Sequence, residues 1–132
     1  MHIKIGPIKN IVLLGGGELL SELAIHSAKE GLNVLVLTSP RHAGGEVDGI
    51  PLLNILKSRG IPTKILEKVD RYELSEILSD MATTFALSIG AAWIFTENII
   101  KNCFQYRLYN CHNSLLPINR GGGGFSWQRA CK

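Results

Sequence analysis

An asparagine and a histidine two residues apart form the part of this sequence best suited to chemistry. They belong to the stretch Tyr109-Asn110-Cys111-His112-Asn113. If this stretch is a strand, Asn110 and His112 face one side of a sheet and Cys111 faces the other. An amide and an imidazole there can both donate hydrogen bonds to a carbonyl oxygen that becomes negative during acyl transfer. The pair therefore predicts an oxyanion-stabilising site, with Cys111 buried as a small apolar residue.

Other interpretations of the same residues are weaker. Taken alone, His112 fits a hydrogen-bonded structural histidine. Cys103, Cys111 and His112 lack the paired spacing of zinc ligands, so no metal is predicted. A cysteine–histidine dyad is disfavoured because adjacent residues of a strand face opposite ways.

A glycine-rich turn is the second candidate site. Gly15, Gly16 and Gly17 follow an apolar run and precede a helical pattern, which is a position suited to anions, although Glu18 would repel a phosphate. Gly15-x-Gly17 also begins the nicotinamide-dinucleotide fingerprint, but Leu20 stands where its third glycine belongs. The next apolar run ends in Thr38-Ser39 without an acid, while Arg41 could contact a 2′-phosphate. An NADP-binding domain is therefore an alternative hypothesis.

The elements that position these residues alternate between strands and helices. Buried strands are predicted at 8–14, 34–37, 85–89 and 108–112, and helices at 19–28, 51–60, 70–81 and 96–102. Gly31 is a predicted helix stop, Asp70 with Glu73 resembles a capping box, and Thr96 is a predicted N-cap. Residues 39–50 are predicted to be a glycine-rich loop. The alternation predicts an α/β, Rossmann-like, doubly wound and mainly parallel sheet with helices on both faces.

Composition and charge narrow the function classes. With 132 residues, of which 45% are hydrophobic and 19% charged, the chain is long enough for one globular domain and unlike a disordered one. A net charge of +3 without a basic block argues against nucleic-acid binding. Three cysteines without framework spacing, and no apolar run of membrane-spanning length, predict a cytoplasmic protein.

The segment around the last strand resembles the signature of the folate-dependent formyltransferases. Asn110-x-His112-x-Ser114-Leu115-Leu116-Pro117, followed by Arg120-Gly121, is similar to that family's motif. The order of strand, glycine loop, alternating units and Asn-x-His strand is similar along the whole chain. The resemblance implies formyl transfer from 10-formyltetrahydrofolate to a primary amine, which would be a small-molecule substrate.

The resemblance also implies roles for two groups of residues. Asn110 and His112 would be the catalytic pair that polarises the formyl group and stabilises the tetrahedral intermediate, and Gly15 to Gly17 would form a substrate loop. The segment that would hold the pterin ring comprises Ile89, Gly90, Ala91, Trp93, Ile94 and Phe95. Simple core packing is an equally good interpretation of Trp93 and Phe95.

The sequence departs from the family pattern at its carboxyl end. The family has an aspartate a few dozen positions beyond the histidine, and this sequence ends at Lys132. We therefore expect an incomplete catalytic domain over residues 1–132, without the last strands and inactive alone. The glycine loop lacks the Ser or Asn of phosphate-binding members, which favours an amino sugar, or a nucleotide-linked one, as acceptor. A methionyl-tRNA formyltransferase and a non-catalytic folate-binding remnant remain alternatives, and an open sheet edge would allow a homodimer.

Overall fold

A five-stranded parallel sheet organises the chain. The computed structural model describes residues 6–78 and 80–112. Its strands are β1 (Asn10–Gly15), β2 (Asn33–Thr38), β5 (Thr63–Ile65), β6 (Thr84–Ile89) and β7 (Leu108–Cys111). They lie in the order β5-β2-β1-β6-β7, and every neighbouring pair is parallel. The predicted fold class, an α/β Rossmann-like sheet, is confirmed.

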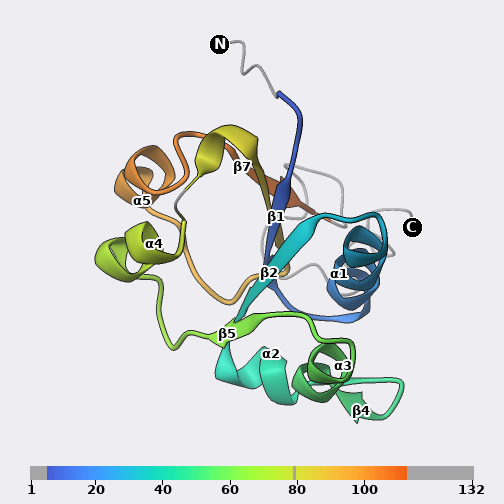
Figure 1. Cartoon of the computed structure of the whole chain (residues 1–132). Coiled ribbons are helices and arrows are strands. Elements are labelled where there is room, and N and C mark those ends of the chain that lie inside the picture. The colour runs from blue at the N-terminus through green and yellow to red at the C-terminus, as the bar shows by residue number, and fades with distance from the viewer. Residues whose placement is uncertain (1–5, 79, 113–132) are drawn as a thin grey trace, which may run out of the picture.

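Helices cover both faces of this sheet, as Figure 1 shows. Helices α1 (Glu18–Lys29) and α3 (Leu52–Ser58) lie on one face, and α4 (Arg71–Ile77) and α5 (Glu97–Asn102) lie on the other. Between β2 and α3 come the short helix α2 (Pro40–Gly44) and a hairpin of β3 (Glu46–Val47) and β4 (Ile50–Pro51). A 3-10 turn, Met81–Thr83, precedes β6. Within the described ranges, no helix is both long and apolar enough to cross a membrane.

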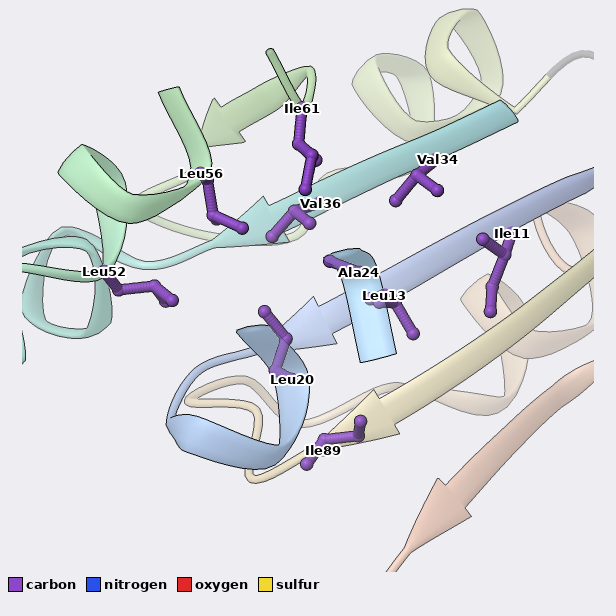
Figure 2. Close-up of a cluster of buried hydrophobic side chains, with 10 residues drawn as sticks. All are labelled: Ile11, Leu13, Leu20, Ala24, Val34, Val36, Leu52, Leu56, Ile61 and Ile89. Carbon is purple, nitrogen blue, oxygen red and sulfur yellow. The ribbon is translucent and has the colours of Figure 1, made fainter. Parts of the chain in front are cut away.

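Alternating side chains of the central strands divide the core into two clusters. Ile11 and Leu13 of β1 face α1 and α3, where Leu20 and Leu56 are fully buried (Figure 2). Val12 and Leu14 point to the opposite face and pack with residues of α4 and α5. A strand buried on both faces must be apolar at successive positions, which is why β1 is a continuous hydrophobic run.

The predicted helix boundaries are mostly confirmed. Thr96 caps α5 by accepting from the backbone N–H of Ile99, and Gly31 follows α1 with a φ of 86°. Asp70 caps α4 by accepting from two backbone N–H groups, but that helix ends at Ile77 rather than Met81. It ends early because Leu78 adopts an extended conformation. The prediction of a loop over residues 39–50 was wrong, since α2 and the β3–β4 hairpin form there.

Candidate functional site

The candidate site lies at the carboxyl ends of β1, β2 and β6. Strand β1 is central, and the chain moves from it towards β2 and β5 on one side before β6 begins the other side. The strand order therefore reverses between β1 and β6. In open α/β sheets, ligands bind outside the carboxyl ends of the strands at such a reversal. The Gly15–Gly17 loop leaves β1 at this point, facing the turn at Gly90 that follows β6.

The three glycines of the loop have three different surroundings. Gly15 has a φ of 135°, and a Cβ placed on it would lie 1.9 Å from the carbonyl oxygen of Ile89. A Cβ on Gly16 would lie 2.6 Å from Cγ of the His42 ring. Gly17 has a φ of 92°, and nothing lies within 4 Å of its Cβ position. Two glycines thus allow close packing of the loop, while the third leaves open space beside the backbone.

The open glycine is also the N-cap of the longest described helix. No side chain accepts a hydrogen bond from the first turn of α1, a helix of 12 residues. By contrast, Ser39, Asp70 and Thr96 each cap their helices with a side-chain oxygen. The N–H groups of the first turn of α1 are therefore left for solvent or a ligand, and they favour an anion. Glu18, the acidic residue of this turn, is exposed and partly offsets that preference.

The end of β2 is tied to the same loop. The hydroxyl of Thr38 is fully buried and donates to the carbonyl oxygen of Gly15 at 2.7 Å. The hydroxyl of Ser39 accepts from the backbone N–H of His42 at 3.2 Å and caps α2. Both side chains are thereby engaged in structural bonds, and neither is a carboxylate. Arg41, in the first turn of α2, is exposed.

His42 is a site residue that the sequence analysis missed. Its ring packs against Gly16, and its Nε2 lies 3.4 Å from Nη2 of Arg41. A guanidinium only donates, so this contact needs a neutral ring with its lone pair on Nε2. Burial, reinforced by the charge of Arg41, lowers the pKa of His42 below 6.5. Among the described residues, its buried Nδ1 has no hydrogen-bond partner.

This environment predicts that the protein loses stability at mildly acidic pH. Between the lowered pKa of folded His42 and 6.5, the unfolded state binds more protons than the folded state. The free energy of unfolding should therefore fall as the pH decreases through this interval. Urea denaturation from about pH 7.5 to about pH 5 should show a shallower pH slope for His42→Gln than for the original protein. His26→Gln, at an exposed position of α1, is the control, and equal slopes for His42→Gln and the original protein would contradict the assignment.

The Asn-x-His pair lies at the end of β7. Asn110 pairs in register with Ser88 of β6 and is exposed, while His112 follows the strand and is half-buried. The prediction that Cys111 is buried was wrong, because it is the last residue of β7, the outer strand of the described sheet, and is exposed there. The remainder of the motif, from Asn113 on, lies outside the described residues. The catalytic assignment of Asn110 and His112 therefore remains a prediction.

The segment assigned to the cofactor ring follows β6. Trp93 and Phe95 pack against the cluster on the α4–α5 face, where Phe95 meets the buried Phe104 edge to face. Ile89 is buried at the end of β6, whereas Ile94 is 87% exposed. Gly90 has a φ of 61°, which allows the turn between them. Packing against the core accounts for Phe95, whereas the buried Nε1 of Trp93 has no hydrogen-bond partner among the described residues. The assignment of this segment to a cofactor remains a prediction.

Comparisons with known proteins find only a distant similarity in structure. No model of a known protein family matches the sequence, and a search of curated proteins finds no relative. The solved structure of SirC, a precorrin-2 dehydrogenase, is similar with a TM-score of 0.43 and 14% sequence identity. The match covers 92% of this chain and 53% of that chain, so this chain spans about half the length of the structure it resembles.

These findings correct the functional prediction. The identification as a folate-dependent formyltransferase was wrong, since no model of a known protein family matches the sequence. The predictions of formyl transfer and of 10-formyltetrahydrofolate as donor were wrong for the same reason. They depended on a short motif. In the described part of that motif, Asn110 is an exposed side chain. Trp93 and Phe95, expected to line a folate pocket, are half-buried and pack against the core.

Proposed function

We propose that this domain binds a nicotinamide dinucleotide, NADP(H) in preference to NAD(H), across the carboxyl ends of β1 and β2. The observation that carries the proposal is the amino-terminal end of α1. It begins at the strand-order reversal with a glycine N-cap, without a side-chain cap, and with open space beside Gly17. This is the arrangement that accepts a pyrophosphate, because backbone N–H groups and the helix dipole both favour negative charge.

The loop supports the proposal position by position. In the dinucleotide fingerprint, the first glycine makes a tight turn and the second lets the backbone approach the pyrophosphate. Gly15 fits the first role through its contact with Ile89, and Gly17 fits the second through its open surroundings. Leu20 occupies the third position, where it is fully buried in the cluster between α1 and the sheet. Helix and sheet therefore pack through a leucine here instead of through a glycine.

Charge at the end of β2 supports the choice of NADP(H). An acid at this position would hydrogen-bond the ribose hydroxyls of NAD. Thr38 and Ser39 stand there instead, and both hydroxyls are engaged in structural hydrogen bonds. Arg41, one turn further on and exposed, can pair with a 2′-phosphate. A bound nicotinamide would supply a donor or acceptor of hydride.

Titration with the two reduced dinucleotides tests the proposal. The fluorescence of NADPH and NADH should change on binding, with NADPH bound more tightly. Arg41→Ala should weaken NADPH binding about tenfold, because it removes a charged hydrogen bond to phosphate, and should leave NADH binding nearly unchanged. Glu18→Gln should tighten both, since it removes a negative charge from the pyrophosphate site.

Arg59→Ala is the matched control for charge. Arg59 is an exposed arginine at the carboxyl end of α3, so its loss changes the net charge equally without touching the site. The proposal fails if neither dinucleotide binds. It also fails if Arg41→Ala and Arg59→Ala weaken NADPH binding to the same extent.

A further inference from the structure

A cavity lies at the opposite end of the sheet from the glycine loop. It has a volume of about 170 Å³ and opens at the amino ends of β1, β2 and β6, where Asn10, Asn33 and Thr84 are the first strand residues. We propose that this amino-end cavity binds a small cationic ligand, an ammonium or amidinium group on an apolar body the size of one ring. This proposal is independent of dinucleotide binding.

The cavity has an apolar body, and it is present because α4 is too short to cover the amino ends of the strands. Val12 of β1 and Leu35 of β2 are partners in register and face the α4 side of the sheet. Helix α4 ends at Ile77, and Leu78 continues in an extended conformation with a φ of −97° and a ψ of 90°. The helix therefore stops before it covers the amino ends of the strands. Ile77 and Leu78 form the wall above Val12 and Leu35.

A chain of hydrogen bonds fixes the polar edge of the cavity. Asn33 Nδ2 donates to Asn10 Oδ1 at 3.0 Å, and Asn10 Nδ2 donates to Thr83 Oγ1 at 3.1 Å. The hydroxyl of Thr83 then donates to Asp80 Oδ2 at 2.7 Å. The hydroxyl of Thr84 donates to the backbone carbonyl oxygen of Asp80. Residues from β1, β2 and the turn before β6 are thus held in one arrangement.

This chain of hydrogen bonds leaves two side-chain acceptors unused. Asn33 Oδ1 and Asp80 Oδ1 take no part in the bonds just described, and both residues are exposed enough to meet a ligand. The carboxylate of Asp80 adds a negative charge. Arg107, which is also near this end of the sheet, turns its Nη1 to the carbonyl oxygen of Met81 at 3.0 Å. The edge therefore suits a ligand that donates hydrogen bonds and carries positive charge.

The volume limits the size of the ligand. An engineered apolar cavity of about 150 Å³ in another protein holds one benzene molecule. At about 170 Å³, the amino-end cavity has room for one ring and a short polar arm. Because it is open on one side, the charged group can stay near solvent while the ring contacts Leu35 and Leu78. An isolated anion would meet the carboxylate of Asp80 and is disfavoured.

Three ring compounds that differ in charge test this inference on the whole chain. Benzylamine, benzyl alcohol and benzoate are titrated separately while the backbone amide resonances are followed by NMR. Benzylamine should shift the amides of Asn33, Leu35, Asp80 and Thr84. It should bind about 3- to 10-fold more tightly than benzyl alcohol, because its hydrogen bond to the carboxylate is charged. Benzoate should bind least.

A charge-removing variant completes the test. Asp80→Asn should reduce benzylamine binding to the level of benzyl alcohol, whereas Glu76→Gln, an exposed carboxylate on α4 outside the cavity lining, should leave it unchanged. If Asp80→Asn fails to fold, the ligand series on the original protein decides the question. The inference is overturned if benzylamine shifts none of the four amides, or if the three compounds bind there equally.

Discussion

Replacing Gly15 with alanine is expected to lower the free energy of unfolding by about 3 kcal/mol or more. The new Cβ would lie 1.9 Å from the carbonyl oxygen of Ile89, a backbone atom that cannot rotate away. The φ of 135° adds strain, because side chains rarely tolerate that conformation. Either β1 and β6 must separate at their carboxyl ends or the loop must change its path. Denaturation by urea measures the loss directly.

Two other glycines give graded controls for this expectation. Gly44→Ala meets nothing within 4 Å at an ordinary φ, so it should change stability by no more than about 0.5 kcal/mol. Gly17→Ala also meets open space but has a φ of 92°, and should cost about 1 kcal/mol. If Gly15→Ala were as mild as Gly44→Ala, the close approach of β1 to β6 would be refuted.

Replacing Leu20 with alanine is expected to lower the free energy of unfolding by about 3 kcal/mol. Leu20 is 0% exposed and packs between α1 and the strands, so truncation leaves a cavity that the surrounding residues fill only in part. Leu20→Gly would create the complete dinucleotide fingerprint and should cost about 1 kcal/mol more, because glycine disfavours the helix interior. Restoring the motif would thus harm the fold.

The neighbouring leucine is the control for this substitution. Leu19 belongs to the same turn of α1 but is 51% exposed, so Leu19→Ala should cost less than about 1 kcal/mol. Urea denaturation of both variants provides the comparison. Equal losses for Leu19→Ala and Leu20→Ala would show that Leu20 does not support α1 on the sheet.

The starts of helices were predictable where a capping residue gives a local signal. Thr96 and Asp70 mark the starts of α5 and α4 in the sequence, because their side-chain oxygens accept hydrogen bonds from backbone N–H groups within three residues. Strand β5, Thr63–Ile65, was missed because three residues contain no periodic pattern. Helix α2 was overlooked although Ser39 and Pro40 are an N-cap and a first-turn proline.

The candidate site was predictable only in part. The glycine run pointed to an anion site, but its spacing does not show which glycine is packed and which is open. The contact of His42 with Gly16 depends on how α2 packs over the glycine loop. The spacing of residues in the sequence does not show this packing. The Asn-x-His motif gave a wrong functional prediction because six matching positions in a stretch of eight residues say little about the packing of the remaining chain. Function has to be argued from the geometry and chemistry of a site, and a short motif at the end of a strand does not supply these.

The central position of β1 also sets an order among the entropy costs of assembly. Its first residue, Asn10, meets Asn33 of β2 across a sequence separation of 23, but meets Thr84 of β6 across a separation of 74. Closing the longer stretch costs about 1 kcal/mol more in chain entropy. Pairing β1 with β2, which α1 connects, therefore costs less chain entropy than pairing β1 with β6. The β1–β2 pair then presents β6 with an edge that is already formed.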